Sequence, residues 1–296
     1  MNQQPIKFKI DNVSFELQDQ HDFTWLQSIG TVFCVFDQQD SGNISFGIEK
    51  NGKKLFVKYA GCRPMEFSGN PRDAISRLKV AVPLYKTLEH PNLIRLIDHF
   101  ETKDGYAAIF EWFNGECLHS HWLFAVQPKH SHPESPFYRF KQLSIEKRLQ
   151  SLDTIYEFHK YVESKGYVAV DFYDGSILYD FSKDLTRICD IDFYRLAPSV
   201  NDMGENFWGA RRSKSPEEFI LGAPIDARTN VFTMGAIAFG LLGGEMDHSF
   251  SKWEANRSLY EVALRAVSKE REERFKTIND FINAWNSVKN QTTTTL

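Results

Sequence analysis

The chain has 296 residues, of which 42% are hydrophobic and 25% are charged, a composition typical of globular proteins and unlike that of disordered chains. Its 35 basic and 39 acidic side chains give a formal net charge of −4, so no broad basic field points to a nucleic-acid partner. The cysteines form no CxxC pair and indicate reduced thiols in a cytoplasmic protein.

The sequence carries no recognisable targeting or membrane signal. Residues 1–7 lack an apolar stretch, so we expect no signal peptide. The longest apolar run, at 231–242, is too short to span a bilayer. We therefore expect a cytoplasmic location and no membrane partner.

Strand signals dominate the first 113 residues. Apolar and β-branched residues predict five strands, at 23–35, 44–49, 54–59, 93–99 and 106–112. The polar residues 37–43 predict a turn, and Asn51-Gly52 is the strongest hairpin signal in the chain. Helical spacing over 71–88 predicts one helix, in which Pro83 favours a bend or an early end.

Helical signals dominate the remainder of the chain. Amphipathic spacing predicts four helices, at 144–162, 225–242, 259–267 and 278–288. The stretch 119–139 is rich in His and Pro and predicts a solvated insertion; a metal site is less favoured, because no carboxylate or Cys follows at ligand spacing. The predicted organisation is an N-terminal extension (1–22), a β-rich unit (23–113), a helical unit (114–290) and a disordered tail (291–296).

Two features of the β-rich half suit a phosphate group. The turn at 36–47 has the tip Ser41-Gly42-Asn43, whose backbone N–H groups are placed to bind phosphate oxygens; an ordinary hairpin turn is the alternative. Lys58 lies inside an apolar strand, where an ammonium group is costly unless it meets an anion. The alternative is an edge strand with Lys58 facing water.

Six stretches, in this chain order, resemble motifs of protein kinases. They are 55–58 (Leu-Phe-Val-Lys), 88–96 (Leu-Glu-His-Pro-Asn-Leu-Ile-Arg-Leu), 167–178 (Tyr-Val-Ala-Val-Asp-Phe-Tyr-Asp-Gly-Ser-Ile-Leu), 186–193 (Thr-Arg-Ile-Cys-Asp-Ile-Asp-Phe), 213–218 (Ser-Lys-Ser-Pro-Glu-Glu) and 229–235 (Thr-Asn-Val-Phe-Thr-Met-Gly). The resemblance covers residues 23–286 and is most similar to atypical bacterial serine/threonine kinase-like proteins.

The resemblance implies an α+β, bilobal fold with a small β-rich lobe containing one main helix and a larger helical lobe, and ATP and Mg²⁺ between them. It implies that Lys58 holds the α- and β-phosphates and that the backbone near Glu111 and Phe113 contacts the adenine. Glu217 is implied to form a structural ion pair with Arg274. The implied activity is transfer of the ATP γ-phosphate to a serine or threonine hydroxyl of a protein substrate.

The helical half is implied to supply the reactive carboxylates. Asp171 corresponds to the catalytic aspartate that orients the acceptor hydroxyl; an Asp in a turn is the alternative. Asp190 corresponds to the Mg²⁺ ligand, with Asp192 as the alternative. Ser176 stands at the position of the second metal ligand, and Asp174 is a possible replacement for it.

The chain departs from the family pattern at several positions. Ala81 stands where the regulatory-helix glutamate is usual, with Glu66 or Asp73 as possible substitutes. The other departures are Ala169-Val170 for His-Arg, Ser176 for Asn, Asp192 for Gly and Asn230 for Asp. Two alternatives to an active protein kinase therefore remain open: an inactive pseudokinase or nucleotide-binding module, and a small-molecule kinase of the aminoglycoside or choline type.

Overall fold

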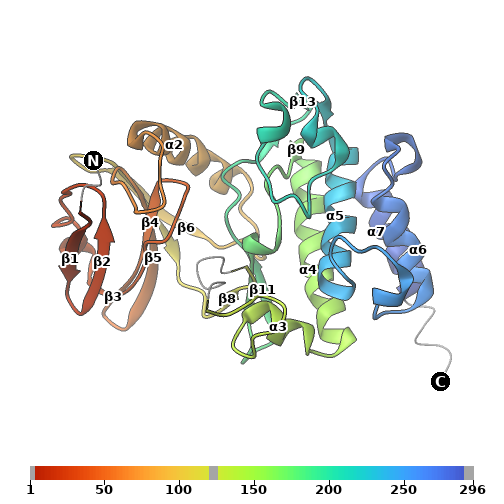
Figure 1. Ribbon diagram of the computed structural model, residues 1–296, viewed down its shortest axis with the longest axis horizontal. Helices are drawn as coiled ribbons and strands as arrows, with labels where there is room; N and C mark the ends of the chain where they lie inside the picture. Colours follow the sequence, from red (N-terminus) through yellow and green to blue (C-terminus); the bar gives the residue numbers. More distant parts are fainter. Residues whose placement is uncertain (1–3, 120–125, 290–296) are drawn as a thin grey trace. The chain divides into compact units, whose positions relative to one another are not determined.

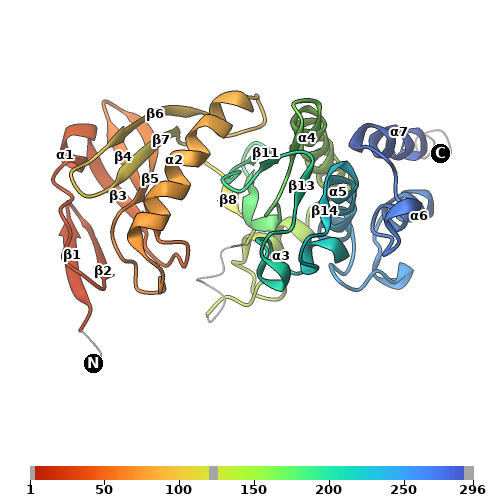
Figure 2. The ribbon, with the colours of Figure 1, turned by 90° about the horizontal axis from the view of Figure 1, so that it is seen from above.

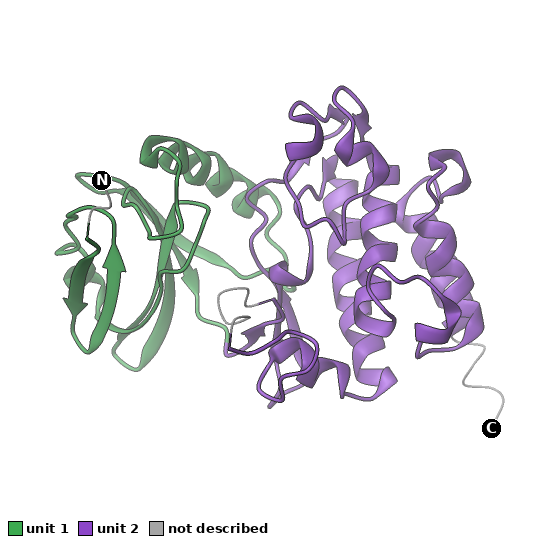
Figure 3. Ribbon diagram, in the orientation of Figure 1, with its two compact units in different colours: residues 1–113 green, residues 114–296 purple. Residues whose placement is uncertain are grey.

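The structure, a computed structural model, describes residues 4–119 and 126–289. It divides into two compact units, Met1–Phe113 and Asn114–Leu296 (Figure 3). The first is rich in strands and the second is mostly helical, which confirms the predicted mixture of α and β structure. The predicted tail at 291–296 and part of the His-rich stretch, 120–125, lie outside the described residues. No helix in the described part of the chain is long and apolar enough to cross a membrane.

The first unit is built on a five-stranded antiparallel sheet with the order β3-β4-β5-β7-β6 (Figure 1). Its strands are β3 (Thr31–Phe36), β4 (Asn43–Lys50), β5 (Lys53–Ala60), β6 (Leu96–Glu101) and β7 (Tyr106–Glu111). Asn51 and Gly52 join β4 to β5 with φ values of 54° and 72°, as a two-residue hairpin turn of type I′ requires. The hairpin predicted at this dipeptide is confirmed.

One face of this sheet is covered by α2 (Pro71–Thr87), where the ring of Tyr85 lies 4.8 Å from that of Phe110. The side chain of Asn70 caps the helix by accepting from the N–H of Arg72. Pro83 lies inside the helix and does not end it, so of the two expected outcomes, a bend or an early end, the early end is wrong. Burial of the residues around Pro83 outweighs the backbone hydrogen bond that proline removes.

The opposite face carries a hairpin that the sequence analysis did not predict, formed by β1 (Ile6–Ile10) and β2 (Val13–Leu17). Figure 2 shows the sheet between this hairpin and α2. Phe15 of β2 packs against Phe46 of β4 in a core that also holds Phe23 and Tyr59. The strand predicted over 23–35 is wrong in its first half, because residues 26–29 form the short helix α1 (Leu26–Ile29), which buries Leu26.

The second unit is organised around α5 (Ala227–Leu242), which is buried on nearly every side and packs against α4, α6 and α7. The other helices are α3 (Pro136–Lys141), α4 (Ile145–Ser164), α6 (Arg257–Ala266) and α7 (Ile278–Lys289). The four predicted helices correspond to α4, α5, α6 and α7. Ser144 caps α4 by accepting from the N–H of Lys147, which explains why the helix begins at Ile145.

Short strands and single turns of 3-10 helix connect the helices of the second unit. The strands are β8 (Glu116–Cys117), β9 (Tyr167–Val168), β10 (Ile177–Asp180), β11 (Leu185–Ile188), β12 (Arg195–Leu196), β13 (Ser199–Val200) and β14 (Pro224–Ile225). The 3-10 turns are η2 (Asp174–Ser176), η3 (Gly204–Asn206), η4 (Pro216–Phe219), η5 (Phe250–Lys252) and η6 (Arg271–Glu273).

Candidate functional site

Lys58 lies on the face of the sheet that α2 covers. Phe110 contacts α2, and its partner Phe56 in β5 lies on the same face of the sheet. Lys58 is two residues after Phe56 in the same strand, so it also lies on this face. Lys58 is half-buried and stands between Ser45 of β4 and Ala108 of β7. The edge-strand alternative is therefore wrong, because β5 is the central strand of the sheet.

The turn between β3 and β4 is held by its neighbours. The guanidinium of Arg77 in α2 donates to the carbonyl of Ser41 at 2.7 Å. Gly42 has φ 83°, and a Cβ built on it would lie 2.6 Å from the ring of Phe67. Glycine is thus required here both by backbone conformation and by the close approach of a ring. Asn43, the last residue of the predicted phosphate-binding tip, is buried at the start of β4.

The carboxylates considered as partners of Lys58 lie in exposed positions. Ala81, at the position of the usual glutamate, is fully buried in α2. Glu66 lies in the exposed segment before α2 and Asp73 in its first turn, where it interacts favourably with the helix dipole.

Glu111, predicted to contact the adenine through its backbone, lies at the end of β7. Its N–H donates to the carbonyl of Arg95, and its carboxylate pairs with the Arg95 guanidinium at 3.2 Å.

In the second unit, Asp171 occupies a turn directly after β9 and has a left-handed backbone with φ 66°. Asn230 of α5, only 1% exposed, holds the chain just before this turn. Its side-chain oxygen accepts from the N–H of Ala169 at 2.8 Å, and its side-chain amide donates to the carbonyl of Tyr167 at 3.2 Å. Asn230 departs from the family pattern, yet it anchors this loop through both ends of its amide group.

Asp190 and Ser176 lie at the same end of the β10–β11 hairpin. The N–H of Cys189 donates to the carbonyl of Ser176 at 2.9 Å, which continues the ladder of the two strands and brings Asp190 next to η2. Asp190 is exposed and left-handed, with φ 54°. Asp192, two residues later, is half-buried. Left-handed backbone is uncommon outside glycine, and Asp and Asn adopt it more readily than other residues.

The charges of Asp171 and Asp190 act on the same two phenols. Burial, followed by the charges of Asp190 and Asp171, raises the pKa of Tyr173. Burial also raises the pKa of Tyr194, with contributions from both aspartates. Each carboxylate thus lies within electrostatic range of both tyrosines. The second unit therefore brings the two predicted carboxylates into one neighbourhood.

The oxygen atoms at this end of the hairpin suit Mg²⁺. The hydroxyl of Ser176 is buried and has no hydrogen-bond partner among the described residues. Carboxylate and hydroxyl oxygens are hard ligands, and Mg²⁺ is usually held by one or two carboxylates together with substrate phosphates. Within residues 4–119 and 126–289, no three His, Cys, Asp or Glu side chains gather into a metal-binding group. The oxygen atoms of Ser176 and Asp190 are therefore of the type that Mg²⁺ takes as ligands.

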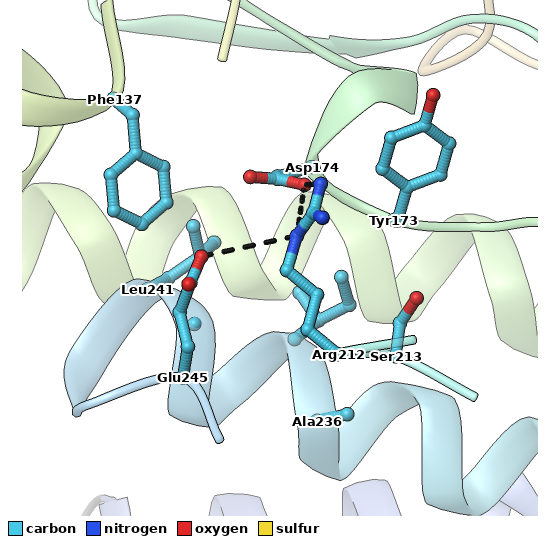
Figure 4. A pocket seen from close by; sticks show the side chains of 10 residues that line it. Phe137, Tyr173, Asp174, Arg212, Ser213, Ala236, Leu241 and Glu245 are labelled. Carbon is cyan, nitrogen blue, oxygen red and sulfur yellow. Dashed lines mark hydrogen bonds and ion pairs between the residues drawn. The ribbon is translucent and has the colours of Figure 1, made fainter. Parts of the chain in front are cut away.

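Asp174, which the sequence suggested as a replacement ligand, is instead part of a buried ion network. Its carboxylate is 2.6 Å from the ammonium of Lys129 and accepts from Nε of Arg212 at 2.9 Å. Figure 4 shows the Arg212 guanidinium between the carboxylates of Asp174 and Glu245. Beside them is a cavity of about 20 Å³, the size of one water molecule, lined in part by Tyr173 and Phe137.

This network also corrects the interpretation of the His-rich stretch. Lys129 is only 7% exposed, pairs with Glu245 as well as Asp174, and lies over the ring of Phe137 at 4.0 Å. Residues 126–134 are irregular and mostly exposed, as the predicted solvated loop requires, but Lys129 and the residues from Ser135 onward are packed into the second unit. No local sequence signal predicts the burial of Lys129, because its partner Glu245 is 116 residues away along the chain.

The implied pair of Glu217 and Arg274 is present in the second unit. Arg274 donates from both terminal nitrogens to the Glu217 carboxylate, at 2.7 and 3.0 Å. Arg271 adds a further contact to Glu217 at 3.1 Å and pairs with Asp226, the N-cap of α5, at 2.6 Å. These contacts tie η4 and η6 to the start of α5.

Glu218, next to this pair, leads to a prediction about pH. Burial raises its pKa from 4.5 to about 7, although its carboxylate accepts from the N–H and hydroxyl of Ser215 at 2.6 and 2.8 Å. The folded protein therefore keeps this proton to a higher pH than the unfolded chain. Its contribution to stability is complete below about pH 4.5 and is lost as the pH rises to about 7.

In the wild type, this group should make the free energy of unfolding fall by roughly 3 kcal/mol over this pH range. We expect Glu218→Gln to abolish that fall. Urea unfolding at intervals between pH 4.5 and 8 measures it. Glu261→Gln is the control, since the Glu261 side chain is exposed on α6. An unchanged pH profile in Glu218→Gln would show that Glu218 titrates normally.

Comparison with known proteins indicates a distant relative. No protein-family model matches the chain. The chain is similar to the serine/threonine-protein kinase pkn2 of Myxococcus xanthus, with 24% identity over 177 residues. The match covers 57% of this chain and 19% of that protein, so the chain spans about a fifth of its relative's length. This likeness indicates a distant kinase-like relationship.

Proposed function

We propose that the chain is an ATP- and Mg²⁺-dependent phosphotransferase of the protein-kinase type that acts on serine or threonine hydroxyls of a protein substrate. The proposal includes the bilobal kinase fold, with Met1–Phe113 as the small lobe and Asn114–Leu296 as the large lobe. The distant likeness to a serine/threonine kinase supports it.

Each residue has a distinct part in the proposed reaction. Asp171 accepts a hydrogen bond from the acceptor hydroxyl, orients its oxygen toward the γ-phosphorus and takes its proton. Lys58 binds the α- and β-phosphates, and Asp190, with Ser176 beside it, binds the metal. When bound, Mg²⁺ neutralises charge on the phosphate oxygens. The backbone near Glu111 and Phe113 contacts the adenine, and the Ser41-Gly42-Asn43 tip covers the phosphates.

The observation that carries the proposal is that Asp171 and Asp190 both lie near Tyr173 and Tyr194 in the second unit. Both are left-handed, both follow short strands, and both charges act on Tyr173 and Tyr194. A base and a metal-binding carboxylate in one neighbourhood are what transfer to a hydroxyl needs.

A second candidate is a nucleotide-binding module without transfer activity. It is favoured by Ala169 and Val170, both buried, at the positions where the family pattern has His and Arg. The two candidates differ in whether the γ-phosphate leaves the nucleotide, so a single labelling experiment separates them.

The test uses the whole chain with γ-labelled ATP, a cell extract as substrate, and graded Mg²⁺. We expect label on serine or threonine of proteins and its loss when EDTA removes the metal. Asp190→Asn should raise the Mg²⁺ concentration for half-maximal labelling at least about tenfold. Glu205→Gln, an exposed carboxylate change in η3, is the control.

The results distinguish the candidates. Nucleotide binding without transfer would establish the second candidate, and label on metabolites alone would establish a small-molecule kinase. Labelling that is unaffected by EDTA would contradict the assigned role of Asp190.

A further inference from the structure

Lys129 makes contacts that the proposed reaction does not use. It comes from the segment before α3, yet its ammonium meets Asp174 in η2 and Glu245 after α5. The segment is held in place, because the hydroxyl of Ser135, the N-cap of α3, donates to the carbonyl of Lys129 at 2.7 Å. Lysine is seldom this buried unless it is paired, so these contacts are specific.

Asp174 is held from a second direction by Arg212. The Arg212 guanidinium pairs with its carboxylate and lies 5.2 Å from the ring of Tyr173 (Figure 4). Asp174 is 5% exposed and is held by two cations from distant parts of the chain.

The loop between these anchors contains Asp171. Asn230 holds its beginning through Ala169 and Tyr167, and the pairs of Asp174 hold its end, three residues beyond Asp171. A left-handed aspartate persists where the surrounding contacts determine its backbone. The two anchors together supply such contacts.

We propose that Lys129 and Arg212 are positioning residues, which fix the loop 171–176 through Asp174 and so keep Asp171 oriented toward the acceptor hydroxyl. The effect on the reaction rate rests on the proposed function. The effect on the loop itself does not, so the two can be tested separately.

The experiment compares Lys129→Met with Lys141→Met in the full chain. Lys141 is a matched control, because it lies at the end of α3, is largely buried and pairs with Glu254, but does not contact Asp174. Backbone hydrogen exchange is measured for peptides spanning 169–177, and phosphotransfer is measured over a range of ATP concentrations.

For Lys129→Met we expect hydrogen exchange in 169–177 to accelerate at least about tenfold. We expect the labelling rate at saturating ATP to fall roughly a hundredfold, because a small displacement of the base is costly. The ATP concentration for half-maximal rate should stay within about twofold of wild type, since Lys129 binds no part of the nucleotide. Lys129→Arg, which keeps the charge, should restore most of the labelling rate. Lys141→Met should change neither the hydrogen exchange in 169–177 nor the labelling rate.

Three results would overturn the inference. They are wild-type exchange in Lys129→Met, equal acceleration in Lys141→Met, and faster exchange with an unchanged rate. If the wild-type chain transfers no phosphate, the proposed function fails, and hydrogen exchange alone decides whether Lys129 fixes the loop. If Lys129→Met does not fold, Arg212→Gln, which removes the charge of the other cation, is measured in the same way and with the same expected directions.

Discussion

Replacing Asp171 with asparagine is expected to slow phosphotransfer by about 10²- to 10⁴-fold, because the acceptor hydroxyl loses the base that takes its proton. Asparagine has nearly the same shape and tolerates the left-handed backbone that Asp171 adopts. The loss should therefore appear in the rate at saturating ATP, while nucleotide affinity stays near that of wild type. Single-turnover labelling together with nucleotide binding by calorimetry measures both.

Asp184→Asn is the matched control for this substitution. Asp184 is also left-handed, with φ 54°, but lies in the turn between β10 and β11, where it pairs with Lys147 and accepts from Tyr179. It should retain the wild-type rate. A wild-type phosphotransfer rate in Asp171→Asn, or an equal loss of rate in both variants, would show that Asp171 is not the base of the reaction.

Replacing Arg274 with methionine is expected to lower the free energy of unfolding of the second unit by about 3–5 kcal/mol. Arg274 is 1% exposed and holds the buried Glu217 through two hydrogen bonds, while a third joins it to the carbonyl of Ser268 at 2.8 Å. Without Arg274, the carboxylate keeps only Arg271 and Thr229 as side-chain partners among the described residues. Chemical unfolding of the full chain, followed by tryptophan fluorescence, measures the loss.

The loss should depend on pH in a defined direction. Burial raises the pKa of Glu217, but the hydrogen bonds and charge of Arg274 outweigh burial and lower it below 4.5. The stabilisation from the pair is therefore complete above about pH 4.5 and is lost as the pH falls through the lowered pKa. The difference in free energy of unfolding between Arg274→Met and wild type should therefore become smaller as the pH falls below about 4.5.

Arg257→Met provides the comparison for a surface pair. Arg257 and Glu261 are 74% and 63% exposed and form a contact within one turn of α6, so their separation should have no measurable effect. Equal stability losses in the two variants would mean that the Glu217–Arg274 pair contributes no more than a surface contact.

Several elements could be predicted from the sequence because their causes are local. The Asn51-Gly52 turn follows from two residues that accept left-handed backbone, and the start of α4 follows from the cap Ser144. The order of the kinase-like motifs likewise selected Asp171 and Asp190 as candidate carboxylates. The hairpin at 6–17 was missed although its alternation of apolar and polar residues was a usable signal.

The sequence by itself thus determined the main helices and most strands of the five-stranded sheet, since these depend on residues a few positions apart. The order of the motifs along the chain selected the candidate carboxylates. Only the tertiary structure decided that Lys129 is buried, that Asp174 is held by cations, and that Asn230 anchors the loop before Asp171. These contacts join residues separated by 38 to 116 positions. Their formation depends on how the folded helices and turns pack, which no local spacing encodes.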